Sequence, residues 1–180
     1  PATTLAKLDD GSFLASGQLP ATDIYTVTFE TPPGSADSVR LEALTHNQLG
    51  RSGPGRTSHG NFVLSHITVS VQPFDNSASP GPAKEVALKS ARADYSQPNY
   101  PIAHALDPSS NRGWGVGLGG NVDRTAWFTF AKPTALSHGG KWKITLKFAF
   151  GSNHILGRFR VAIGSEKTLT QDNAIRTTTR

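Results

Sequence analysis

Several short segments of the chain alternate between apolar and polar residues, a period of two that is typical of β-strands with one buried face. In the clearest case every second residue from 142 to 148 is apolar, and lysines and one threonine lie between them. Tyr25, Val27 and Phe29 share one predicted face in the same way. The segments predicted as strands are residues 24–29, 39–44, 62–71, 85–88, 124–130, 142–150 and 159–163.

Clusters rich in Gly, Pro, Asn and Ser separate these strands, and such residues are typical of turns. The only helix candidate is short and covers residues 101–106. Regularly spaced strands and turns of this kind favour an all-β fold. We expect a single antiparallel β-sandwich or jelly roll over residues 1–164, followed by a polar tail or linker over residues 165–180.

The composition narrows the class of protein. The chain has 180 residues, 36% hydrophobic and 17% charged, which suits one globular core and excludes a coiled coil. No apolar run approaches the roughly 18–20 residues of a membrane-spanning helix, so no membrane insertion is expected. The chain has no Cys and no Met and begins with Pro. We expect a monomeric module of a larger bacterial protein that is exported to the periplasm or the cell exterior, with its export signal outside this sequence.

Charge is distributed unevenly along the chain. Residues 1–45 hold two basic and six acidic residues, whereas residues 46–180 hold sixteen basic and seven acidic ones. A basic surface attracts anions such as nucleic acid, acidic lipid or acidic polysaccharide. Nucleic acid is the weaker candidate here, because the aromatic residues are interleaved with predicted core positions rather than set out for base stacking.

Three groups of motifs resemble a known module. They are LDDGSFLASG (8–17) followed by DIYTV (23–27), VRLEAL (39–44) with GPGR (53–56) and GNFVLS (60–65), and ALD (105–107) with GW (113–114) and HILGRFR (154–160). In this order they resemble a non-catalytic module of large planctomycete-type proteins that also carry cytochrome c-like segments. The resemblance spans roughly residues 5–164. It implies a non-catalytic domain and no particular ligand.

A second resemblance concerns the fold. Residues 91–114 include Tyr95, Tyr100-Pro101 and Gly113-Trp114, and are similar to the opening of discoidin-type, galactose-binding-like β-sandwiches. The pieces similar to the closing strands of those domains, RL (40–41) and LSHITV (64–69), come before this opening. The resemblance therefore implies a circularly permuted sandwich. Many of its members are carbohydrate-binding modules.

Many galactose-binding-like domains also hold a structural calcium ion, so the resemblance makes Asp107 a candidate metal ligand. Two departures speak against it: His66 replaces a glutamate that is often a ligand, and Pro108 follows Asp107 where a glycine is usual. An imidazole is a poor substitute for the oxygen ligands that calcium needs. The alternative is that Asp107 forms a turn with its own main chain.

The first candidate binding segment covers residues 50–60. It holds Arg51, Arg56 and His59, and no acidic residue lies between His46 and Leu64. Guanidinium groups offer forked donors that suit sulfate or carboxylate. Arg56 has a second interpretation, in which it pairs with an inner-face acid such as Glu42 and holds the loop. Asn61, at the end of the segment, completes this group of ligand candidates.

The second candidate segment covers residues 111–114, where Asn111 and Arg112 could bind sugar hydroxyls or charges and Trp114 could stack on a pyranose. For Trp114 we favour a place in the core, as in discoidin-type domains, which leaves Arg112 as the sugar contact. The third candidate segment is His154 with Arg158. If Lys141, Lys143, Lys147, Arg158 and Arg160 share a sheet face, they form a basic platform, or simply a solvated face.

No motif indicates catalysis. The chain has no Gly-x-Ser-x-Gly or Walker motif, and its histidines lack the spacing of a zinc site. We expect a non-catalytic carbohydrate-binding module for an acidic, preferably sulfated, polysaccharide. The alternatives are a protein-interaction or adhesion domain, and more remotely a polysaccharide lyase with Tyr25 or Tyr100 as the acid/base.

Overall fold

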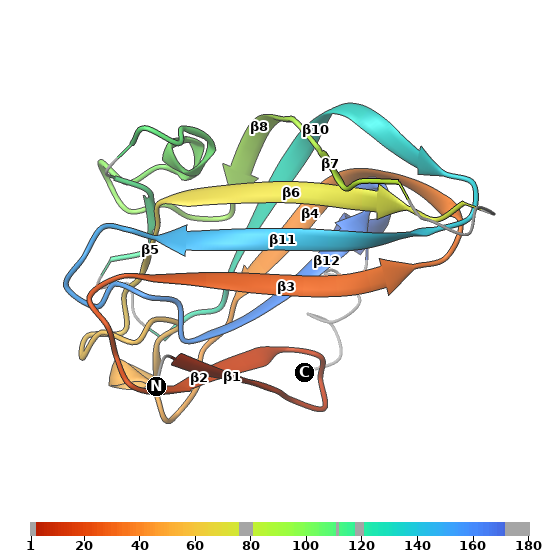
Figure 1. Cartoon of the computed structure of the whole chain (residues 1–180). Helices are drawn as coiled ribbons and strands as arrows, with labels where there is room; N and C mark the ends of the chain where they lie inside the picture. Colours follow the sequence, from red (N-terminus) through yellow and green to blue (C-terminus); the bar gives the residue numbers. More distant parts are fainter. Residues whose placement is uncertain (1–2, 76–80, 111, 118–120, 172–180) are drawn as a thin grey trace.

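The computed structural model describes residues 3–75, 81–110, 112–117 and 121–171. Two antiparallel sheets lie face to face and form the predicted all-β sandwich (Figure 1). The first sheet has six strands in the spatial order β1 (Thr3–Lys7), β2 (Phe13–Gly17), β12 (Arg158–Gly164), β4 (Gly34–Ala43), β10 (Arg124–Leu136) and β8 (Leu88–Ala93). The second has four in the order β3 (Asp23–Thr31), β11 (Gly140–Phe148), β6 (His66–Pro73) and β7 (Lys84–Glu85).

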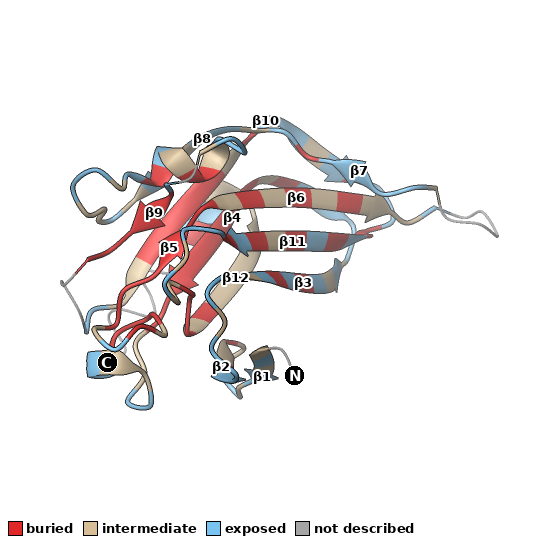
Figure 2. Cartoon of the chain, turned by 60° about the vertical axis from the view of Figure 1, so that its left-hand side comes forward, coloured by how far each residue is buried: buried red, intermediate tan, exposed pale blue. Residues whose placement is uncertain are grey.

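The hydrophobic core fills the space between the two sheets, whose facing sides are buried in Figure 2. On β11 the side chains of Ile144, Leu146 and Phe148 are at most 1% exposed, whereas the lysines at positions 141, 143 and 147 face solvent. Antiparallel pairing of β11 with both β3 and β6 repeats this pattern across the sheet. In β3, β6 and β11 the period of two therefore determines which face of the strand is buried, as predicted.

Strand β4 departs from simple alternation. Its residues Ser38, Arg40 and Glu42 are on the outer face of the sheet, yet they are at most 4% exposed. Residues 166–171 form a short helical turn whose Leu169 is 4% exposed, and the guanidinium of Arg40 donates a hydrogen bond to the main-chain oxygen of Leu169. The described part of the predicted tail therefore packs on the fold, and residues 172–180 lie outside the described residues.

The remaining elements are short and lie at one end of the sandwich. Strands β5 (Val63–Leu64) and β9 (Trp114–Gly115) pair with each other, and two 3-10 helices cover Gly50–Ser52 and Ile102–Leu106. The second of these confirms the helix candidate at 101–106. In the described part of the chain no helix is long and apolar enough to cross a membrane.

Candidate functional site

Residues 50–60 form a tightly packed loop. A Cβ atom added at Gly55 would lie 1.9 Å from the main-chain oxygen of Asn61, so the two chain segments can only approach this closely at a glycine. The main-chain N–H of Arg56 donates to the main-chain oxygen of Ile155 at 2.8 Å. The loop is thereby fixed against the segment that follows β11.

Four rings, those of Tyr100, Phe150, His154 and His59, lie in a row across three loops at this end of the sandwich, and we call them the ring row. Tyr100 packs edge-on against Phe150 with ring centroids 5.6 Å apart, and Phe150 packs edge-on against His154 at 5.0 Å. The row continues to His59, whose ring centroid is 5.6 Å from that of His154. Phe150 is 36% exposed and the other three rings are half-buried, so the row is open to solvent.

Arg51 extends this row with a permanent positive charge. It is exposed, and its φ of 46° places it in a left-handed turn. No hydrogen bond or ion pair joins its guanidinium to any other described residue. Partial burial, the charge of His154 and the charge of Arg51 all lower the pKa of His59. We call Arg51, His59, Tyr100, Phe150 and His154 the loop-end site.

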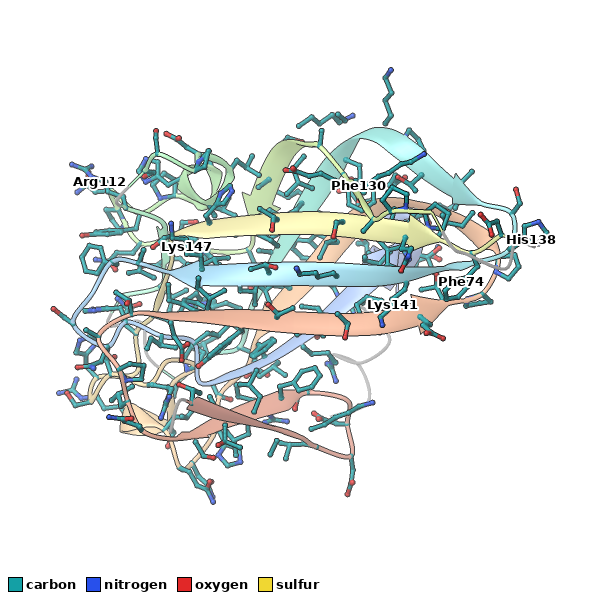
Figure 3. The ribbon with its side chains drawn as sticks, in the orientation of Figure 1. Phe74, Arg112, Phe130, His138, Lys141 and Lys147 are labelled. Atoms are coloured by element: carbon teal, nitrogen blue, oxygen red, sulfur yellow. The ribbon has the colours of Figure 1, made fainter. Side chains whose placement is uncertain are left out.

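Arg112 belongs to another loop, and no contact between described residues joins it to the loop-end site. Its side chain is exposed and points away from the fold in Figure 3. The antiparallel pairing of Trp114 with Leu64 carries the chain before Trp114 past Leu64 toward Ser65, away from the 50–60 loop. Asn111, the other polar candidate of this segment, lies outside the described residues.

Two of the predicted ligand residues are core residues instead. Trp114 is fully buried, its Nε1 donates to the main-chain oxygen of Tyr95 at 3.0 Å, and its ring packs edge-on against Phe62. It cannot present a face to a sugar, which corrects its place among the ligand candidates and agrees with the core alternative. Asn61 is 6% exposed.

The carboxamide of Asn61 organises the main chain rather than a ligand. Its Oδ1 accepts hydrogen bonds from the amides of Val116 at 3.0 Å and Gly117 at 2.8 Å. Burial of an amide without such partners would be costly, so these bonds explain why a polar side chain sits here. Asn61 therefore holds the main chain of residues 116 and 117 against the end of the 50–60 loop.

The guanidinium of Arg56 also forms hydrogen bonds within the protein, but not with Glu42, its predicted partner. Its guanidinium donates to Thr3 Oγ1 at 2.9 Å and to the main-chain oxygen of Gly17 at 2.9 Å, which ties the β1–β2 hairpin to the 50–60 loop. Glu42 pairs instead with Arg160, in a two-pronged ion pair at 2.7 and 2.8 Å. The structural interpretation of Arg56 holds, and the predicted pairing with Glu42 is wrong.

Arg158 uses all three guanidinium nitrogens inside the protein. Nε donates to Ser12 Oγ at 3.0 Å, one terminal nitrogen to the main-chain oxygen of Thr45 at 2.9 Å, and the other to Asp10 at 2.7 Å. Arg158 also lines an open polar pocket of about 360 Å³ with five other residues, Thr45, His46, Asn47, Ser52 and Asn121. Its three bonds give it a structural role within the fold, and its assignment as a ligand residue stays a prediction.

The predicted platform of five basic residues does not form. Lys141, Lys143 and Lys147 lie on the outer face of the four-stranded sheet, and Figure 3 shows Lys141 and Lys147 at opposite ends of β11. Arg158 and Arg160 belong to β12, in the other sheet, where they pair with carboxylates. The sequence could not reveal that the two segments enter different sheets.

Asp107 forms the turn proposed as the alternative to a calcium ligand. Its Oδ1 accepts from the main-chain N–H and the hydroxyl of Ser109 at 2.9 and 2.7 Å, and these bonds lower the pKa of Asp107. Within the described residues no three His, Asp or Glu side chains gather as metal ligands. A calcium ion at Asp107 would depend on main-chain oxygens, and it stays a prediction.

The two tyrosines considered for a lyase differ in environment. Tyr25 is 2% exposed and its hydroxyl donates to the main-chain oxygen of Leu156 at 2.9 Å. Burial raises the pKa of Tyr25. A buried hydroxyl with a raised pKa is a poor general base. Tyr100 belongs to the ring row described above.

Phe150 is the residue of the site that the sequence did not single out. It stands at the end of an alternating segment, where it would count as one more core position, and Gly151 follows it. The strand ends at Phe148, so Phe150 lies in the loop and becomes exposed. An aromatic residue directly before a glycine is the signal that could have marked it.

Comparison with known protein families, with curated proteins and with solved structures gives no match for this chain. The resemblances to a planctomycete-type module and to discoidin-type domains therefore stay predictions. The loop-end site itself has to indicate what the protein does.

Proposed function

We propose that this domain is a non-catalytic carbohydrate-binding module for an acidic, preferably sulfated, polysaccharide, and that the loop-end site binds it. The supporting observation is the arrangement of the ring row beside Arg51. Exposed ring edges and faces suit the C–H side of a sugar, and a guanidinium without an internal partner suits a sulfate or a carboxylate.

The environment of the other basic residues supports the same choice. Arg56, Arg158 and Arg160 already bind main-chain oxygens or carboxylates of the protein itself. Because these groups would have to break internal bonds to reach a ligand, they are poor binding residues. The guanidinium groups of Arg51 and Arg112 form no such bond with another described residue, so they can bind a ligand without breaking one.

A non-catalytic role is proposed because Tyr25, one of the two acid/base candidates, is buried and bonded to the main chain. We further propose that the domain acts outside the cytoplasm as one part of a larger protein, in keeping with its lack of cysteine. Binding should be weak, since each exposed charged hydrogen bond adds roughly 1 kcal/mol. It should also weaken with salt, because 0.1 M salt screens surface charges beyond about 10 Å.

Affinity gel electrophoresis tests this proposal. We expect dextran sulfate in the gel to retard the protein, polygalacturonate to retard it less, and neutral dextran not to retard it. Arg51→Ala should weaken retardation by dextran sulfate about fivefold, which corresponds to about 1 kcal/mol. Lys143→Ala removes one exposed charge from the distant sheet face, and should have little effect.

Three results would count against the proposal. Retardation by neutral dextran alone would contradict the role of Arg51, and equal losses in the Arg51 and Lys143 variants would indicate unspecific attraction by net charge. Retardation by no polysaccharide would favour the protein-interaction or adhesion alternative. Release of unsaturated sugar products would revive the lyase.

A further inference from the structure

Two histidines occupy the charged end of the ring row, and each has its Nδ1 nitrogen directed at an oxygen acceptor. His154 Nδ1 lies 3.1 Å from the main-chain oxygen of Gly151, which can only accept, so Nδ1 carries the hydrogen. His59 Nδ1 lies 3.4 Å from Thr57 Oγ1. That hydroxyl already donates to the main-chain oxygen of Asn61 at 2.8 Å, and is left as an acceptor for His59.

The Nε2 nitrogens are therefore the atoms that change on protonation. In the neutral rings each Nε2 carries a lone pair, and in the charged rings each carries an N–H. Neither Nε2 has a hydrogen-bond partner among the described residues. Protonation thus turns two acceptors, which repel an anion, into two donors that bind one.

We propose that the loop-end site binds the anionic group of its ligand together with protons, which His59 and His154 take up on their Nε2 nitrogens. This inference rests on the proposed function and adds that binding is controlled by pH. The site would hold a sulfate between Arg51 and the two charged imidazoles at acidic pH and release it at alkaline pH.

The charges around His59 disfavour its protonation in the free protein. Arg51 approaches His59 from the 3-10 helix at Gly50–Ser52, and His154 approaches it from the segment after β11. The pKa of His59 is lowered by its burial and by both of these charges, and no carboxylate is among the causes. On its other side His154 meets the edge of Phe150, which carries no charge. Without an anion the site therefore resists holding three positive charges.

A bound sulfate reverses this balance. Its negative charge favours the charged form of each imidazole and opposes the burial and the two positive charges that lower the pKa of His59 in the free protein. The affinity for the sulfate must then rise as the pH falls from alkaline to acidic values. A tenfold gain in affinity corresponds to raising the pKa of one histidine by about one in the complex.

Isothermal titration calorimetry with low-mass dextran sulfate tests the coupling. Sulfate esters stay ionised throughout, so only the protein titrates. At constant ionic strength we expect about tenfold tighter binding at pH 5.5 than at pH 8 for each histidine whose pKa rises by about one, and so up to about a hundredfold for the pair. Repeating the titration near pH 6.5 in buffers of different ionisation enthalpy should show an uptake of about half a proton for each such histidine, or about one proton for the pair.

Replacing the two histidines with neutral glutamines tests whether they cause the pH dependence of binding. The double variant His59→Gln, His154→Gln should lose most of the gain in affinity that the original protein shows between pH 8 and pH 5.5. His138→Gln is the matched control, because His138 is an exposed histidine at the opposite end of the sandwich (Figure 3). This control should keep the full gain.

The outcomes separate the coupling from the function. Binding that is equally strong at pH 5.5 and pH 8, or a gain that persists in the double variant, would overturn the coupling and leave the proposed function intact. Absence of binding at both pH values would overturn both.

Discussion

The guanidinium of Arg158 and the carboxylate of Asp10 form an ion pair at 2.7 Å that joins β12 to the turn between β1 and β2. Asp10 also accepts hydrogen bonds from the hydroxyl and the main-chain N–H of Ser12, at 2.6 and 2.9 Å. Only two residue pairs connect β2 to β12 in the sheet. The hairpin is therefore held to the sandwich largely by side chains, and Arg158 stabilises the fold rather than a ligand.

Substitutions at Arg158 and Arg51 should separate stability from binding. Arg158→Gln removes three hydrogen bonds, one of them to a carboxylate, and should lower the free energy of unfolding by about 2 kcal/mol. The affinity of the folded variant for dextran sulfate should not change. Arg51→Gln should weaken the affinity for dextran sulfate and leave the free energy of unfolding unchanged. Urea denaturation and affinity electrophoresis measure the two effects, and a loss of affinity in the Arg158 variant without a loss of stability would contradict this assignment.

Acidic pH should weaken the ion pair that joins the β1–β2 hairpin to β12. Partial burial raises the pKa of Asp10, but the bonds from Ser12 and the charge of Arg158 outweigh it and lower the pKa from 3.8 to about 2. A lowered pKa in the folded state contributes stability that is present above about pH 4 and lost as the pH falls through about 2. Because this carboxylate is half exposed, we expect a contribution of about 1 kcal/mol.

The variant Asp10→Asn isolates this contribution. Its deficit in unfolding free energy relative to the original protein should be about 1 kcal/mol at pH 6, and should vanish near pH 2. Urea denaturation at a series of pH values measures the difference. A deficit that stays constant down to pH 2 would show that the charge of Asp10 is not responsible.

Asn61 should be necessary for the loops without touching the ligand. Asn61→Ala leaves the buried amides of Val116 and Gly117 without an acceptor, which should cost roughly 2–4 kcal/mol of stability. Asn47→Ala is the matched control, because Asn47 is exposed and no side-chain hydrogen bond joins it to another described residue. Thermal unfolding should distinguish the two, and equal melting temperatures would refute the role of Asn61.

The sequence predicted the strands of the sandwich core well, because a buried face leaves a period of two in any strand that lies between the sheets. It did not predict β1 and β2. Their residues are mostly exposed or half-buried, so their alternation is weak. Both strands depend on pairing with each other and on contacts with Arg56 and Arg158, which are far away in the sequence.

The site was predicted only in part, for a related reason. Arg51, His59 and His154 were predicted as ligand residues in loops, and they do lie together. Whether an arginine is available for a ligand depends on the acids near it in space, and Asp10 is 148 residues from Arg158. No local pattern reports such a contact. The ring row could not be predicted for the same reason, because its residues come from three separate loops.

We propose that the loop-end site, and not the lysine-bearing sheet face, binds an acidic polysaccharide. Chemical-shift mapping by NMR at pH 6, with ¹⁵N-labelled protein and dextran sulfate oligosaccharides, distinguishes the two surfaces. We expect the largest changes at Arg51, His59, Phe150 and His154, with small ones at Lys141, Lys143 and Lys147. Changes concentrated on the three lysines, or none at all, would refute binding at the loop-end site.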